Sequence, residues 1–214
     1  QYNRGTEKDL QAEFGELELD KIMDEIAISY SNSLKNRELL VKYDRDLFQG
    51  ILTSDSGGDE YLVKSLYDIL ANNALDYFFR RAKYGEFSSQ KQELQNSILY
   101  TLPENFIKID SFPEGKHQRV LLLYRELMNV HSTNEKALLN YSLKRLNYVY
   151  SNSSEEKKVK NLYESLEAHI QSFPANSVVS EYWHRKALML IRNTIPFTLK
   201  YKKRIDSALA ICKY

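Results

Sequence analysis

The stretch SLYDILANNALDYFF, Ser65–Phe79, decides the fold class, because its apolar residues recur with the period of an α-helix. The polar residues of this segment and the turn after it are spaced four apart and share one face: Asp68, Asn72, Asp76 and Arg80. Ser65 followed three residues later by Asp68 has the spacing of a capping box, in which each side chain binds the other residue's backbone N–H. We therefore predict a largely buried helix over residues 66–84, with Ser65, Tyr67, Asp68 and Asp76 as its structural motif.

The rest of the chain shows the same helical pattern. The 214 residues include only 7 Gly and 4 Pro, fewer turn residues than an all-β protein of this length needs. The cap sequences STNE (132–135) and SSEE (153–156) mark the starts of two helices. Further helices are predicted at residues 8–34, 37–52, 89–100, 116–130, 135–150, 155–173, 178–192 and 197–213. The expected fold class is all-α.

A weak internal repeat indicates how the C-terminal half is organised. Val120, Leu123, Tyr124 and Leu127 recur 39 residues later as Val159, Leu162, Tyr163 and Leu166. This spacing suits a helix–turn–helix unit that stacks on its neighbour. We predict a single all-helical region over residues 1–214, with a bundle at 1–115 and an antiparallel, tetratricopeptide-like or α-solenoid array at 116–214. Because Tyr214 falls inside a predicted helix, we expect the chain to be a fragment of a larger protein.

Composition argues against several classes of partner. The formal net charge is +1, from 30 basic and 29 acidic residues, so no nucleic-acid partner is expected. The basic cluster at residues 200–204 is typical of a solvated helix face. Cys212 is the single cysteine and cannot form an internal disulfide. The apolar runs are too short to span a bilayer, so we expect no direct membrane insertion by this segment.

The sequence contains no recognisable catalytic or metal-binding constellation. Asp68 and Asp76 lie about 12 Å apart along their helix, too far for an acid and base that share one bond. The histidines lack metal-ligand spacing: His117, His131, His169 and His184. No phosphate-binding glycine loop or nucleophile elbow is present. We therefore expect a non-catalytic chain without cofactor or metal.

The segment EYWHRKALMLIR, Glu181–Arg192, holds the only tryptophan. Trp183, with the adjacent Tyr182, is the candidate contact for a ligand or partner, because an exposed indole stacks on sugars and peptides. Packing between helices is the alternative role for Trp183.

The segment YLVKSLYDILANNALDYFF resembles a helical segment of bacterial, Bacteroidetes-type alpha-2-macroglobulin-like proteins. The matching positions are Leu66, Tyr67, Asp68, Leu70, Ala71, Ala74, Leu75, Asp76 and Phe78. Lys64 and Ser65 replace a proline and a threonine of that pattern, and Ser65 keeps the capping hydroxyl. Residues 26–40, 162–187 and 208–214 resemble other helices of the same region.

The resemblance implies a non-catalytic helical scaffold near the N-terminus of a large exported protein that traps or inhibits proteases. The implied location is the bacterial cell envelope, periplasmic or surface-exposed. The implied partners are other domains of the polypeptide, proteases or envelope proteins. Cys212 is followed by Lys213 and Tyr214, so it does not match the family's thioester motif.

Two alternatives to this scaffold stay open. One is a complete tetratricopeptide-like surface lipoprotein that binds glycan or peptide through Trp183 and tyrosines. The other is an all-α enzyme, which requires titratable groups that converge in one pocket.

Overall fold

A computed structural model describes residues 21–48, 62–84, 94, 97–115, 117–154, 157–192 and 206–210. Over these residues the chain is mostly helical and contains no β-strand, which confirms the all-α class. The chain divides into two compact units, Gln1–Phe78 and Phe79–Tyr214. The boundary between the units falls inside helix α3 (Leu66–Tyr84), and the segments at 97–107 pack with the later helices.

The first unit contains a helix at residues 21–33, a short helix α2 (Arg37–Leu40), a 3₁₀ turn η1 (Arg45–Phe48) and the first part of α3. Tyr30 stacks on Tyr77 of α3 with ring centroids 5.1 Å apart. The Tyr77 hydroxyl donates to the carbonyl of Met23 at 2.6 Å. Aromatic packing and one hydrogen bond therefore join the helix at 21–33 to α3.

The continuous helix predicted over residues 37–52 is interrupted. The Arg45 N–H donates to the Lys64 carbonyl at 3.0 Å, and the Leu66 N–H donates to the Tyr43 carbonyl at 2.9 Å. The Asp44 carboxylate accepts from the Asp46 N–H at 2.9 Å, a local turn that competes with the helix. The backbone around Asp44 therefore pairs with the residues at the start of α3, and the helix predicted over residues 37–52 does not continue through Asp44.

Helix α3 begins where the capping box predicts. The Ser65 hydroxyl accepts from the Asp68 N–H at 3.3 Å, and Asp68 Oδ2 accepts from the Ser65 N–H at 2.9 Å. Asp68 Oδ2 also accepts from the Lys64 N–H at 3.0 Å and the Ser65 hydroxyl at 3.0 Å. Asp68 is only 1% exposed, whereas Asp76 is exposed. The four-residue polar stripe is therefore not one solvated edge, because its first member is buried in the cap.

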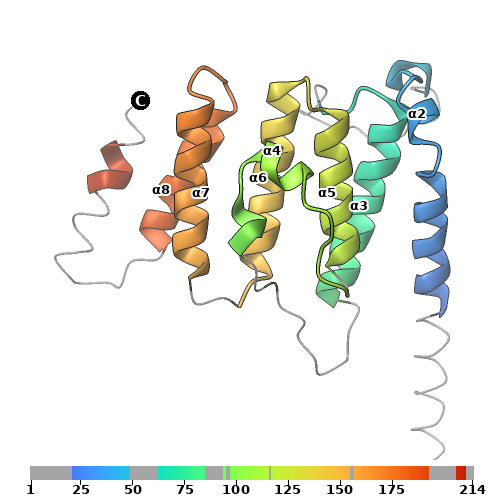
Figure 1. Cartoon of the computed structure of the whole chain (residues 1–214), viewed down its shortest axis with the longest axis horizontal. Coiled ribbons are helices and arrows are strands. Elements are labelled where there is room, and N and C mark those ends of the chain that lie inside the picture. The colour runs from blue at the N-terminus through green and yellow to red at the C-terminus, as the bar shows by residue number, and fades with distance from the viewer. Residues whose placement is uncertain are drawn as a thin grey trace, which may run out of the picture. The chain divides into compact units, whose positions relative to one another are not determined.

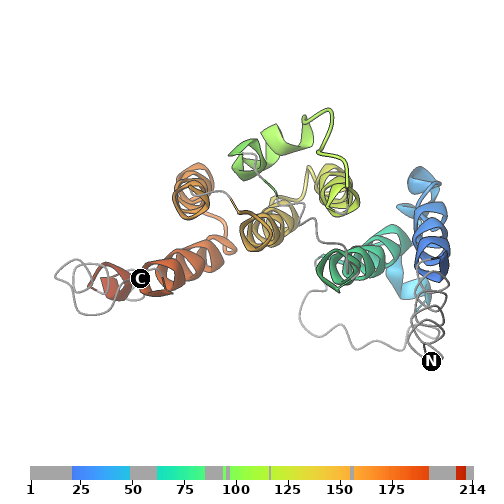
Figure 2. The ribbon, with the colours of Figure 1, turned by 90° about the horizontal axis from the view of Figure 1, so that it is seen from below.

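Among its described residues, the second unit is built around its longer helices (Figure 1). They are α5 (Gln118–Val130), α6 (Glu135–Ser151), α7 (Lys158–Ser172) and α8 (Val179–Arg192). Shorter elements precede and follow them: η2 (Ser97–Tyr100), α4 (Pro103–Ile107) and a helical turn at 206–210. Helix α5 packs on α6, α7 packs on α8, and η2 and α4 pack across α6. Figure 2 views α5, α6 and α7 nearly along their axes and shows α6 between the other two.

The helix starts in the second unit agree only partly with the cap sequences. Asn134 is the N-cap of α6, and its side chain accepts from the Ala137 N–H at 3.3 Å. The SSEE prediction is wrong, because α7 begins at Lys158 after an N-cap, Lys157, that makes no side-chain cap bond. Of the helix predicted at 89–100, the described part from 97 onward is the 3₁₀ turn η2. Helix α4 was not predicted. Its first turn nevertheless contains Pro103 and Glu104, and proline and acidic residues are both favoured in the first turn of a helix.

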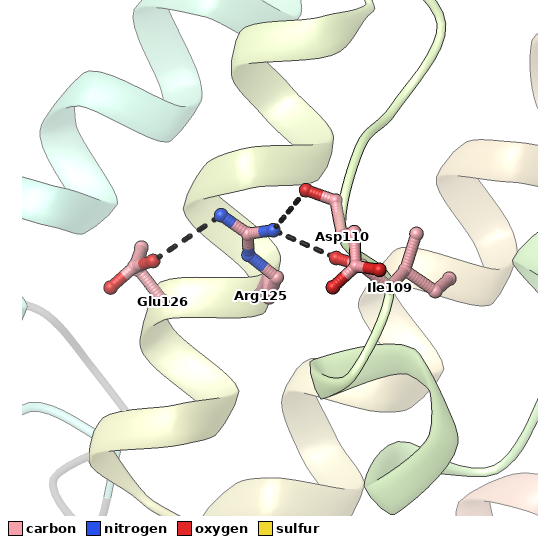
Figure 3. Close-up of polar contacts among 4 residues, drawn as sticks. All are labelled: Ile109, Asp110, Arg125 and Glu126. Atoms are coloured by element: carbon pink, nitrogen blue, oxygen red, sulfur yellow. Dashed lines mark hydrogen bonds and ion pairs between the residues drawn. The ribbon is translucent and has the colours of Figure 1, made fainter.

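Arg125 of α5 forms hydrogen bonds to the segment that follows α4 (Figure 3). Its Nη1 donates to the carbonyls of Ile109 at 2.8 Å and Asp110 at 3.2 Å. The guanidinium carbon lies 5.5 Å from the centre of the Phe112 ring, and Nη2 lies 3.7 Å from Glu126. A single side chain thereby satisfies two carbonyls of a non-helical segment.

Two of the four positions of the internal repeat have matching burial in α5 and α7. Leu127 and its counterpart Leu166 are completely buried, and Leu123 and Leu162 are also in the core. Val120 and Tyr124 are buried, whereas Val159 and Tyr163 are only partly buried. The two leucine positions therefore carry the similarity between the two helices.

Candidate functional site

A buried chain of polar groups runs through the second unit, from α6 to α7. Arg145 Nη2 donates to the Ser142 hydroxyl at 3.0 Å, and the Ser142 oxygen lies 2.9 Å from His169 Nε2. His169 Nδ1 lies 2.7 Å from the Ser165 carbonyl one turn earlier in α7. Arg145, Ser142 and His169 have no solvent-accessible surface.

The partners of His169 determine its tautomer. A carbonyl only accepts, so Nδ1 carries the proton that is donated to Ser165. Nε2 is then an acceptor for the Ser142 hydroxyl, which itself accepts from Arg145. Burial lowers the pKa of His169; the hydrogen bond to Ser165 acts against this and the nearby Arg145 charge adds to it, and the resulting pKa is about 4. His169 is therefore neutral at physiological pH.

This geometry is that of a serine activated by a histidine, but its surroundings lack what catalysis needs. A nucleophile–base pair needs a hydroxyl within reach of the base and space for a substrate. The Ser142–His169 distance meets the first requirement. Both side chains are completely enclosed, so no substrate carbonyl reaches the hydroxyl in this conformation. The arrangement supports packing of α6 on α7.

Sequence reasoning missed this cluster. Ser142 and Arg145 are three residues apart on a helix whose neighbours are mostly apolar, a signal for a buried polar pair. No sequence pattern connects Ser142 with His169, which lies 27 positions later. Their contact depends on how α6 packs on α7.

The structure separates the two candidate contact residues Tyr182 and Trp183. Tyr182 is completely buried, donates to the Leu139 carbonyl at 2.7 Å and stacks on His169 at 5.0 Å. Burial raises the pKa of Tyr182, as expected for a phenol kept neutral in the core. Trp183 is 37% exposed and lies on the surface of α8. Of the pair, Trp183 is the residue that solvent, or a partner, can reach.

Trp183 belongs to a group that we name the Lys186 clasp, which consists of the buried Lys186 with Trp183, Tyr163 and Glu167. The Lys186 ammonium lies 4.9 Å from the Trp183 ring centre and 4.7 Å from the Tyr163 ring centre. It also lies 3.2 Å from a carboxylate oxygen of Glu167. Two aromatic rings and a carboxylate are a favourable environment for a cation. The clasp therefore fastens α8 to α7 while Trp183 stays partly exposed.

The other histidines have separate environments. His117 Nδ1 lies 2.6 Å from the Tyr148 hydroxyl, whose pKa burial raises. His131 stacks on Tyr141 at 5.5 Å, and His184 is exposed. Within the described ranges, no group of three His, Cys, Asp or Glu side chains is placed to hold a metal ion. The basic cluster at 200–204 and Cys212 lie outside the described residues.

Comparison with known proteins gives no relative: no family model, no curated protein and no solved structure matches the chain. Among the described residues, no helix has the length and apolar content required to cross a bilayer.

Proposed function

We propose that this chain is a non-catalytic helical scaffold that presents a protein-binding surface, and that its C-terminal half is a tetratricopeptide-like, solenoid-type array. The observation that carries the proposal is the pairing of α5 with α6 and of α7 with α8, with equivalent leucines buried in α5 and α7. Stacked helical hairpins build extended surfaces that bind other chains.

The polar core supports a structural and not a catalytic role for the interior. Ser142, Arg145 and His169 bind one another or the backbone carbonyls of Thr101 and Ser165. Buried polar groups with such partners specify one packing arrangement of helices.

The resemblance of Ser65–Phe79 to alpha-2-macroglobulin-like proteins provides a context for the scaffold. In that context the chain lies in a bacterial envelope protein whose parent traps or inhibits proteases. Its partners are then other domains of the parent, proteases or envelope proteins. The capped helix α3 fits a packing element of such a scaffold.

The mass of the native protein tests whether the chain is part of a larger parent protein. An antibody against this chain is used to recover the native protein from its source cells, and its intact mass is measured. We expect a mass far above the 25.1 kDa of the chain. A native mass close to that of the chain contradicts a multidomain parent.

The binding surface can be tested by photo-crosslinking at Trp183. Trp183→benzoylphenylalanine is expressed in the source cells in the full protein, with Glu181→benzoylphenylalanine as the matched control. Both residues are exposed, and they are two positions apart on α8 and therefore face different directions. We expect one defined adduct from position 183, within the parent or to an envelope protein, and none from position 181. Equal yields from both positions contradict a specific surface at Trp183.

A second candidate function is binding of glycan or peptide by a stand-alone surface lipoprotein. The partial exposure of Trp183 favours it, because an indole face stacks on sugar rings. A glycan array first identifies glycans that bind the chain. Titration of the chain with these glycans, followed by Trp183 fluorescence, then distinguishes the two candidates, since Trp183 is the only tryptophan. Saturable quenching supports glycan binding.

A further inference from the structure

Arg145 is a buried guanidinium whose hydrogen-bonding capacity is only partly used. Its Nη2 donates to the Thr101 carbonyl at 2.7 Å and to the Ser142 hydroxyl at 3.0 Å. The Phe106 ring centre lies 4.2 Å from the guanidinium carbon. Nε and Nη1 are buried and have no hydrogen-bond partner in the part of the chain that the structure describes. An arginine that is 0% exposed therefore keeps two nitrogens, with three N–H donors between them, that make no hydrogen bond to the described residues.

Among the described residues, no acidic side chain is bonded to Arg145. Its partners are a carbonyl, a hydroxyl and an aromatic ring, and none of these is an anion. Burial lowers the pKa of Arg145 to about 10, while Tyr182 and Tyr124 act in the opposite direction. The guanidinium therefore remains protonated at neutral pH. Buried charges in proteins are generally paired, because an isolated charge in the interior is strongly unfavourable.

An unused hydroxyl group belongs to a residue that Arg145 contacts directly. Thr101 provides the carbonyl that Arg145 binds, and its hydroxyl is buried and makes no hydrogen bond within the described ranges. This hydroxyl can donate to an anion. The cluster of Arg145 and Thr101 therefore has spare donors and, within the described ranges, one uncompensated positive charge.

We propose that the Arg145 cluster binds one small monovalent anion, of the size of chloride, inside the second unit. One negative charge matches the one guanidinium, whereas a divalent oxyanion brings a second charge that no described neighbour balances. The complete burial of Arg145 favours a small ion. Chloride is the probe for this class of ligand, and bromide is its heavier substitute.

The first test measures thermal unfolding of the wild-type chain in chloride and in gluconate at equal ionic strength. We expect the unfolding midpoint to rise by about 3 °C for each tenfold increase in chloride above its dissociation constant. Arg145→Met should abolish this dependence. Arg125→Met is the matched control, since Arg125 binds the carbonyls of Ile109 and Asp110, and it should retain the chloride dependence.

A second test does not depend on the folding of a variant. Wild-type crystals are soaked in sodium bromide, and anomalous scattering locates the ions. We expect a bromide within about 3.5 Å of a guanidinium nitrogen of Arg145. If bromide is found at surface lysines and not at Arg145, it is an adventitious ion only, and this result overturns the proposal. Equal midpoints in chloride and gluconate also overturn it, because buried water would then satisfy the free donors.

Discussion

The hydroxyl oxygen of Ser142 in α6 lies 2.9 Å from Nε2 of His169 in α7, and both residues are completely buried. The same contact in an open pocket would be the start of a nucleophilic site. Here Arg145 donates to the same hydroxyl, and the Ser165 carbonyl orients the imidazole. Burial thus distinguishes a packing contact from a catalytic one, and the following predictions test that distinction and the rest of the fold.

Ser142 should not react with a fluorophosphonate probe in the native chain. The probe reaches only exposed, activated serines, and Ser142 has no accessible surface. Intact mass spectrometry after incubation measures adduct formation. An adduct that disappears in Ser142→Ala, but persists in the exposed control Ser180→Ala, would show that Ser142 is a nucleophile.

The neutral, buried His169 should make the chain less stable in acid. Its pKa is lowered from 6.5 to about 4 in the folded state, so between these values the unfolded state binds the extra proton. Stability is then fully present above pH 6.5 and is lost as the pH falls towards 4, by about 3 kcal/mol. Urea unfolding across this pH range measures the loss. His169→Gln should remove most of this pH dependence, whereas the exposed His184→Gln should keep it.

The capping box should contribute measurably to α3. Ser65→Ala removes the hydroxyl that accepts from the Asp68 N–H and should cost about 1 kcal/mol. Asp68→Ala removes the acceptor of the Lys64 N–H and leaves the buried Ser65 N–H unpaired, and it should cost about 2–3 kcal/mol. Asp76→Ala, on the exposed face, should stay within about 0.5 kcal/mol of wild type. Equal losses for Asp68→Ala and Asp76→Ala would argue against the cap.

The repeated leucines should be energetically equivalent. Leu127→Ala and Leu166→Ala each leave a cavity at a completely buried position and should destabilise the chain by about 2–5 kcal/mol. Leu209→Ala, at a position that is 56% exposed, should have little effect. Chemical unfolding of the three variants provides the comparison. A large loss at only one of the two repeat positions would count against stacked equivalent units.

The Lys186 clasp should shield one part of the only tryptophan. Lys186→Ala removes the ammonium that lies 4.9 Å from the Trp183 ring centre. Acrylamide should then quench Trp183 fluorescence more strongly, because the quencher gains access to the ring. Lys160→Ala is the control, since Lys160 is exposed and pairs with Glu164 at 3.6 Å. An unchanged quenching constant in Lys186→Ala would mean that Lys186 does not cover the indole in solution.

The sequence by itself determined the features that depend on neighbouring residues. The all-α class follows from helical periodicity and few turn residues, and the start of α3 follows from the reciprocal bonds of Ser65 and Asp68. The cap of α6 by Asn134 is equally local. Such contacts span three residues, so their partners are visible in the sequence.

Tertiary structure alone decided the features that depend on distant residues. The break after α2 requires the Arg45–Lys64 backbone bond, and the Ser142–His169 contact requires α6 to pack on α7. Packing also decided which of Tyr182 and Trp183 is buried. Adjacent residues point about 100° apart on a helix, so the sequence pattern leaves open which of two aromatic neighbours faces the core. The free donors of Arg145 were equally invisible, because only the folded unit shows that no acid lies beside them in the described part of the chain.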